Sequence, residues 1–289
     1  MRWTPGGESR NIEDRRGSGG MGMAPMGIGG TIVVLVLSLL FGRNFVGGSG
    51  GGGTDQGTAQ QSAPGQVAPV EQSPAEAKEV QFVSFVLDTA QATWARLLPE
   101  DMDTQWHDAK LVLFREATPT GCGVGQTAMG PFYCPVDQKI YIDLAFYDEL
   151  RSRFGAPGEF AEAYVLTHEL GHHVQHLLGT DDEVRRAQQA NPDQANALSV
   201  KLELQADCYA GVWAYETGKE NILQPGDIES GLNAAAAVGD DRIEQQTTGH
   251  VDADTFTHGT SAQRVSWFKR GFQNGNPRDC DTFAGGPGL

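Results

Sequence analysis

The chain has 289 residues, of which 39% are hydrophobic and 38 are glycine. This length fits one large or two small domains, and the apolar content suffices for a packed core because the glycines are concentrated in the first third. The formal net charge of -16 argues against nucleic acid and anionic membrane surfaces as binding partners, since like charges repel.

An uncharged stretch near the N-terminus predicts a transmembrane helix. No charge occurs from Gly17 to Gly42, and a bilayer span needs about 20 largely apolar residues, so residues 21–43 are predicted to cross the membrane. Arginines precede this stretch, so the positive-inside rule predicts that residues 1–20 form a cytoplasmic basic head and that the rest lies outside. A cleaved secretory signal is the alternative. The long polar start and the lack of a small-x-small cleavage pattern favour an uncleaved signal anchor.

A tether and a long helix are predicted next. Residues 44–77 consist largely of Gly, Ser, Gln, Ala and Pro, which bury too little apolar surface to fold and are typical of a flexible linker. Apolar residues then recur at helical spacing up to Pro99, where the helix is predicted to stop. The folded domain is therefore expected to span residues 78–289.

Two short strands are predicted after this helix, over residues 110–114 and 138–143. The loop between them is rich in glycine and contains two cysteines. Residues 138–143 come shortly before the helix that carries the metal-binding signature described below, and a strand at such a place can pair along its edge with an extended peptide. Residues 138–143 are therefore expected to receive a substrate.

Helices dominate the remainder of the chain. They are predicted over residues 158–178, 195–216 and 227–238, from their apolar spacing and terminating glycines. A last helix follows Thr260, which has capping-box spacing with Gln263. The expected fold class is α+β, mainly helical with a small sheet, preceded by one transmembrane helix.

The four cysteines are Cys122, Cys134, Cys208 and Cys280, and no C-x-x-C pair occurs among them. An even number in an exported domain predicts two disulfides. Of the three possible pairings we favour Cys122 with Cys134, which closes a short loop, and Cys208 with Cys280, which ties the C-terminal tail to a helix. Four buried thiols, natural in a cytosolic protein, are the alternative.

A metal-binding signature lies within the helix predicted over residues 158–178. His168 and His172 belong to an H-E-x-x-H pattern, and at a spacing of four residues both imidazoles project from one helix face and can hold one zinc ion. Glu169 lies beside that face, where a carboxylate can take a proton from a metal-activated water. A chance match of so short a pattern is the alternative interpretation.

A catalytic zinc usually has three protein ligands, so a third is expected downstream. Glu203 is the candidate, because the helix that carries it can fold back antiparallel to His172. One turn later, Asp207 can orient a ligand imidazole through its other ring nitrogen. Gly171 and Ala206 are small enough to let the two helices approach. A solvated acidic pair is the alternative for Glu203 and Asp207 taken alone; after the H-E-x-x-H pattern they predict one Zn²⁺ per chain.

A hydrogen-bond donor to the oxyanion that forms when water attacks a carbonyl is also expected. The possible donors are His258, Tyr141 and Tyr147, and His258, beside a glycine at a helix start, is the first to test. The alternative for His258 is a histidine that is satisfied within a capping loop or the core. His173 and His176 are interpreted as surface or packing residues.

Several short motifs together carry a family resemblance. They are GPFYCP (130–135), AYV (163–165), HELGHHVQ (168–175), ELQADC (203–208), GDDR (239–242), FTHGTS (256–261) and CDTF (280–283). With them, residues 1–285 resemble the bacterial neutral zinc metallopeptidases, single-pass membrane proteins of the gluzincin type. The resemblance implies zinc ligands at His168, His172 and Glu203 and a catalytic Glu169, and it names no substrate.

These features predict a membrane-anchored zinc endopeptidase of reduced zincin architecture. Its catalytic domain is expected outside the cytoplasmic membrane, with a peptide or protein as substrate and the lipid bilayer as partner through the N-terminal helix. The alternative is a non-catalytic, zinc-stabilised binding or assembly module at the cell surface. A purely structural site has no use for a carboxylate at Glu169 and tends to fill its fourth position with protein, which favours the enzyme. The oligomeric state does not follow from the sequence.

Overall fold

The computed structural model describes residues 1–17, 70 and 72–284. The segment predicted to cross the membrane, residues 21–43, and most of the predicted tether lie outside these residues. Among the described residues, no helix combines the length and apolarity that a bilayer crossing requires.

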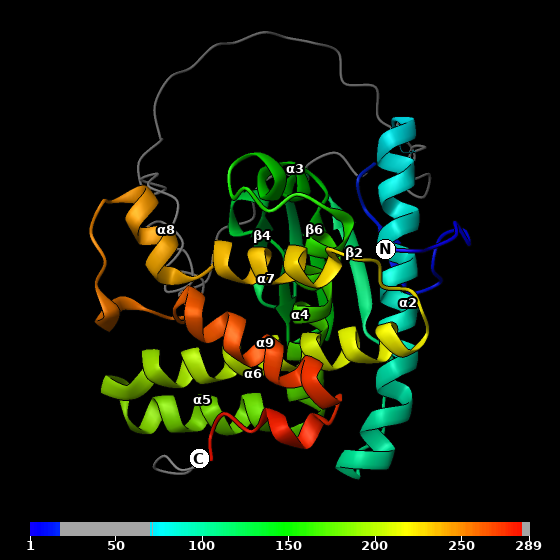
Figure 1. The fold of residues 1–289 in the computed structure, drawn as a ribbon. Coiled ribbons are helices and arrows are strands. Elements are labelled where there is room, and N and C mark those ends of the chain that lie inside the picture. The colour runs from blue at the N-terminus through cyan, green and yellow to red at the C-terminus, as the bar shows by residue number, and fades with distance from the viewer. Residues whose placement is uncertain (18–69, 71, 285–289) are drawn as a thin grey trace, which may run out of the picture.

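The described residues form a helical domain with two small sheets (Figure 1). The strands are β1 (Ile12–Asp14), β2 (Lys110–Phe114), β3 (Ala117–Thr120), β4 (Gly123–Gln126), β5 (Phe132–Cys134) and β6 (Lys139–Asp143). The helices are α2 (Pro74–Met102), α3 (Ala145–Ser152), α4 (Glu159–Leu178), α5 (Thr180–Ala190), α6 (Ala195–Lys219), α7 (Asp227–Ala237), α8 (Asp240–Thr247) and α9 (Ser261–Asn274). The predicted α+β, mainly helical class is confirmed.

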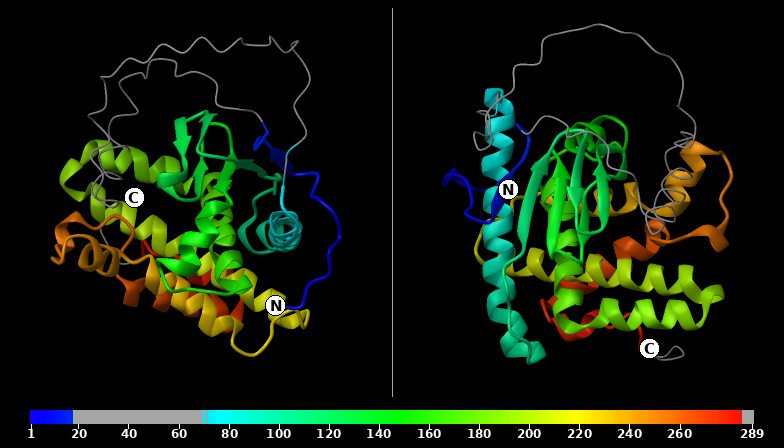
Figure 2. Two further views of the ribbon diagram at one scale, coloured as in Figure 1. Left: turned by 90° about the horizontal axis from the view of Figure 1, so that it is seen from above. Right: turned by 180° about the vertical axis from the view of Figure 1, so that it is seen from behind.

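The larger sheet has the strand order β1-β2-β6-β5, in which β5 alone runs antiparallel to its neighbour. Side chains of β2 and β6 alternate between two buried faces, as the strand period of two requires. Leu111 and Ile140 belong to the main core, together with residues of α2 and α4. On the other face, Val112 and Tyr141 form a smaller core. Figure 2 shows α2 standing alongside this sheet.

The strand that was expected to receive a substrate is an interior strand. β6 pairs with β2 on one side and with β5 on the other, so its backbone groups are already hydrogen-bonded. The terminal strand on this side of the sheet is β5, which contacts α4. β5 has only 3 residues and lies between Pro131 and Pro135, which is why its sequence was interpreted as a loop.

The N-terminal residues are packed into the domain instead of forming a separate head. β1 extends the sheet beside β2, and the Arg16 side chain is buried against Asp14 and Glu76. A strand of 3 residues with the sequence IED carries too little apolar pattern to be recognised in the sequence.

The first long helix differs from its prediction at both ends. α2 begins at Pro74, with Ser73 as its N-cap, before the predicted domain boundary at residue 78. It also continues past Pro99, where it was predicted to stop, and ends at Asp103 in the left-handed conformation. Proline in the last turn removes only one helical hydrogen bond, and burial of Leu98 just before it holds the turn in place.

Helices α4, α6 and α9 pack closely and bring the site residues together. A Cβ added to Gly171 of α4 would lie 3.0 Å from the Cα of Ala206 on α6, which confirms the predicted close approach. The crossing of α6 and α9 is tighter, because a Cβ on Gly271 would lie 1.9 Å from the carbonyl oxygen of Cys208. Only glycine permits such a contact between two helix backbones.

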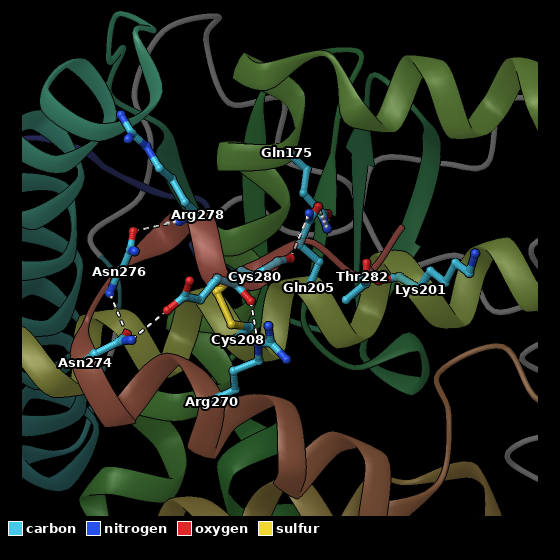
Figure 3. The surroundings of a disulfide bond; sticks show 11 residues. Gln175, Lys201, Gln205, Cys208, Arg270, Asn274, Asn276, Arg278, Cys280 and Thr282 are labelled. Atoms are coloured by element: carbon cyan, nitrogen blue, oxygen red, sulfur yellow. Dashed lines mark hydrogen bonds between the residues drawn. A yellow bond between two sulfur atoms is a disulfide. The ribbon is translucent and has the colours of Figure 1, made fainter. Parts of the chain in front are cut away.

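Both predicted disulfides are present. Cys122 is bonded to Cys134, and Cys208 is bonded to Cys280. The second bond attaches the segment after α9 to the middle of α6 (Figure 3). This attachment lies one residue from Asp207, so the C-terminal segment is held directly against the helix that supplies two of the predicted site residues.

Candidate metal centre

The two histidines of the H-E-x-x-H pattern project from α4 toward Glu203 of α6. The Nε2 atom of His168 lies 3.1 Å from one carboxylate oxygen of Glu203, and the Nε2 atom of His172 lies 3.5 Å from the other. The two imidazole rings are nearly perpendicular, with centroids 4.9 Å apart. The predicted antiparallel return of the second helix therefore brings all three residues to one point.

This cluster fits a zinc ion. One donor atom from each of His168, His172 and Glu203 lies within 4.8 Å of the other two. Two imidazole nitrogens and a carboxylate, with space left for a fourth group, form the donor set of catalytic zinc sites. Burial by itself would raise the pKa of Glu203, but His172 and the neighbouring imidazoles hold it well below its usual range. Glu203 therefore carries a negative charge for the metal at neutral pH.

Asp207 orients His168 as predicted from the sequence. Its Oδ1 atom accepts a hydrogen bond from Nδ1 of His168 at 2.9 Å, which leaves Nε2 to face the cluster. The carboxylate is itself held by Arg264 of α9, whose Nε and Nη2 atoms donate at 2.8 and 2.9 Å, and by the hydroxyl of Tyr164. Burial opposes ionisation of Asp207, yet Arg264 and His168 keep its pKa below the ordinary value.

The second histidine is positioned through a chain of amides. Nδ1 of His172 donates to Oε1 of Gln175 at 2.8 Å, and Nε2 of Gln175 donates to Gln205 at 3.0 Å. Gln205 in turn donates to the carbonyl oxygen of Cys280 at 3.1 Å (Figure 3). The disulfide of Cys280 with Cys208 thus anchors the far end of a network that fixes the ring of His172.

Glu169 lies beside the cluster, as the signature predicts. Its side chain is buried, and burial, with the nearby Glu203 carboxylate opposing its charge, raises the pKa of Glu169 to about 7. The carboxyl group lines the same pocket as His168 and His172. A carboxyl group poised near neutral pH is suited to accept and return a proton.

The pocket over these residues has a volume of about 380 Å³ and a largely apolar lining. Besides the cluster, Glu169, His258 and Arg264, the lining includes Pro131, Phe132, Tyr133, Phe146, Phe154, Val165, Leu202, Val238 and Ile243. Strand β5 supplies Phe132 and Tyr133, so the terminal strand of the sheet borders the pocket.

His258 lines this pocket and is held by Asp240. The Oδ1 atom of Asp240 lies 3.1 Å from Nδ1 of His258, while Oδ2 accepts the backbone N–H groups of Thr257, His258 and Gly259 at 2.8, 2.6 and 2.9 Å. With Nδ1 directed at this carboxylate, Nε2 is the nitrogen that remains for the pocket. Asp240 therefore organises the loop of residues 257–259 that carries His258.

The other donors considered lie elsewhere. Tyr141 donates to Asp137 at 2.6 Å, and Tyr147 is buried in the main core. Neither tyrosine is among the described residues that line the pocket. His173 is a packing residue as interpreted, fully buried between the hydroxyl of Tyr133 and a backbone carbonyl.

Sequence reasoning missed three residues that support the cluster, namely Arg264, Tyr164 and Gln175. Each is a buried polar side chain on a helix, where burial without a hydrogen-bond partner would be costly. This cost could have indicated Arg264 from the sequence, because an arginine next to the apolar positions of its helix needs a buried partner. The partner of each residue comes from another helix or another turn, so it could not be named from spacing.

A comparison with family models agrees with this geometry. Residues 1–283 match the family described as "Putative neutral zinc metallopeptidase". The chain belongs to this family. The match includes β1 and α9 as well as the H-E-x-x-H helix, so the family covers the entire described fold.

Relatives of this chain occur in Escherichia coli and Mycobacterium tuberculosis. The uncharacterized protein YpfJ of Escherichia coli is 47% identical over 291 residues, which cover 98% of this chain and 99% of the relative. The uncharacterized protein Rv2575 of Mycobacterium tuberculosis is 48% identical over 208 residues, or 68% of each chain. No solved structure matched the chain.

Proposed function

We propose that this protein is a zinc-dependent endopeptidase that hydrolyses peptide bonds with Glu169 as general base. The observation that carries the proposal is the convergence of His168, His172 and Glu203 within 4.8 Å, with the Glu169 carboxyl in the adjoining pocket. Bound zinc would supply a Lewis acid for the scissile carbonyl and would lower the pKa of the attacking water.

Protein side chains would transfer the proton, stabilise the oxyanion and position the metal ligands. Glu169 takes the proton of the attacking water and returns it to the leaving amine, and its place in the pocket beside the cluster suits this role. His258 donates from Nε2 to the negative charge that develops on the carbonyl oxygen. Asp207 and Gln175 hold the two ligand imidazoles, so the donor atoms need little rearrangement when the metal binds.

The pocket favours an extended peptide with a large apolar side chain beside the scissile bond. Among the described strands β5 pairs only with β6, so a substrate strand could pair with its other edge, where main-chain groups provide affinity without selecting side chains. Selection would come from the apolar lining, where Val165 lies one turn before Glu169 and Phe146 and Phe154 lie nearby. Cleavage sites are accordingly expected next to Leu, Phe or similar residues.

Metal removal tests the function. The purified full chain is incubated with a peptide mixture, and new termini are identified by mass spectrometry. Cleavage is expected, is lost after treatment with a chelator, and returns on addition of Zn²⁺, because the cluster has no other electrophile at its centre. A protein that binds one zinc and cleaves no peptide would instead be a zinc-stabilised binding module.

Replacing His258 separates oxyanion stabilisation from metal binding. We expect His258→Ala to lower kcat by roughly 10²- to 10³-fold, the cost of removing one oxyanion donor, while zinc content stays unchanged. Steady-state kinetics and metal analysis of the same sample provide the measurement. An unchanged kcat would remove His258 from the mechanism and leave it as a loop residue.

The compartment of the domain stays a prediction of the sequence. Two disulfides support a domain that matures in an oxidising space outside the cytoplasmic membrane.

A further inference from the structure

The first residues of the chain are a structural part of the metal-binding domain. β1 pairs in parallel with β2 over Ile12–Asp14, and backbone bonds of 2.8 Å join Arg15 N–H to the Leu113 carbonyl and Leu111 N–H to the Asn11 carbonyl. These bonds satisfy the outer edge of β2, whose side chains from Leu111 to Phe114 are buried in the two cores. Without β1, that edge of an apolar strand would be left unpaired.

Side chains reinforce the pairing at several points. Ser9 donates to Asp88 of α2, Asn11 donates to Asp108 at 2.9 Å, and Lys139 of β6 donates to Glu13 at 2.7 Å. The Arg16 side chain is only 1% exposed and forms ion pairs with Asp14 and Glu76. Arg15 and Arg16 had been interpreted as signals that hold the head in the cytoplasm. The structure gives them ion-pair partners inside the fold, Glu13 for Arg15 and the two acids just named for Arg16.

The chain leaves the fold and rejoins it at one place. Nη2 of Arg16 lies 3.0 Å from Oε1 of Gln72, and Nη1 lies 2.9 Å from Glu76 at the start of α2. The two points that flank residues 18–71 are thus in direct contact. A single membrane crossing between them would instead separate them by about 30 Å of hydrocarbon.

Two ends on one side of a bilayer require an even number of crossings. Between Gly17 and Gln72 the sequence has one apolar run of spanning length, within residues 21–43, and residues 44–69 are small and polar. The sequence between these two points therefore contains no second run of about 20 apolar residues that could form another span. We propose that residues 1–17 and 72–284 fold as one unit and lie on the same side of the membrane. This proposal does not depend on peptidase activity.

Cysteine labelling of the full chain tests the proposal in bacterial cells. All four native cysteines are disulfide-bonded, so a new cysteine is the reactive thiol. Arg10→Cys reports on the first segment and Gln189→Cys on α5, both at exposed positions. Spheroplasts are treated with a membrane-impermeant maleimide before and after permeabilisation. Both variants are expected to behave alike: either both react in intact spheroplasts, or both react only after permeabilisation. Reaction of one variant before and the other only after permeabilisation would overturn the proposal.

A second pair of variants tests whether the first segment is docked. Ser9→Cys with Asp88→Cys joins two side chains that are in contact, and Arg10→Cys with Asp88→Cys is the matched control from the exposed side. After treatment of intact cells with the membrane-permeant oxidant diamide, only the first pair is expected to give the linked peptide by mass spectrometry. Loss of that link, or equal linkage in both pairs, contradicts a docked β1.

Discussion

Glu169→Gln is expected to lower kcat/KM for peptide hydrolysis by roughly 10²- to 10⁴-fold, the contribution of a positioned acid or base. Glutamine has nearly the same shape but cannot accept the proton of the attacking water. Glu169 is adjacent to the cluster and does not belong to it, so the zinc content should remain at one per chain. Kinetics on a peptide identified from the mixture, with metal analysis of the same preparation, measure both quantities.

Glu162→Gln is the matched control for this experiment. Glu162 lies two turns earlier on α4, is also buried, and also has a pKa raised by burial to about 7. Its partner is Arg151, and it is not among the described residues that line the pocket. Activity of this variant should stay near wild type. Equal losses in both variants would show that neutralising a buried carboxyl group weakens α4 generally, and would not support a general base at residue 169.

Glu203→Ala is expected to weaken zinc binding by more than the roughly 10- to 100-fold typical of a lost supporting residue, because it removes a ligand itself. The lost group is the ionised carboxylate that faces both imidazoles, at 3.1 and 3.5 Å. Competition with a chromogenic chelator gives the affinity, independently of turnover.

Glu216→Ala provides the comparison on the same helix. Glu216 is likewise a mostly buried glutamate of α6, and it pairs with Arg96 and Lys219 far along the helix from the cluster. Its loss should lower the free energy of unfolding without changing zinc affinity. If Glu203→Ala keeps wild-type affinity, Glu203 is not a ligand and the third position must be sought elsewhere.

The centre of the site could be predicted because its information is local. Spacing on one helix places His168, Glu169 and His172, and a second helix with Glu203 and Asp207 four residues apart has only one compact way to return. The surrounding groups depend on contacts between distant segments. Arg264 meets Asp207 only because glycines let α9 approach α6, and Asp240 reaches the His258 loop only through the packing of α8.

The fold follows the same division. Long periodic helices such as α4 and α6 were predicted almost to their ends, because amphipathic spacing repeats over many residues. β1 and β5 have 3 residues each and owe their existence to neighbouring strands, so no local pattern could reveal them. The membrane segment was inferred from the apolarity of its sequence. Hydropathy cannot predict that β1, just before this segment, pairs with β2.

The amide network from His172 through Gln175 and Gln205 to Cys280 couples metal binding to the reduction of the Cys208–Cys280 disulfide. Linkage is reciprocal: whatever factor the Cys208–Cys280 bond contributes to metal affinity, bound metal contributes the same factor to the stability of that bond. Because the intact bond holds the network that positions His172, we expect it to favour metal binding, so a metal-loaded chain should resist reduction at this disulfide better than a metal-free one. Thiol reagents and chelators should then act as synergistic agents on this protein, each making the other more effective.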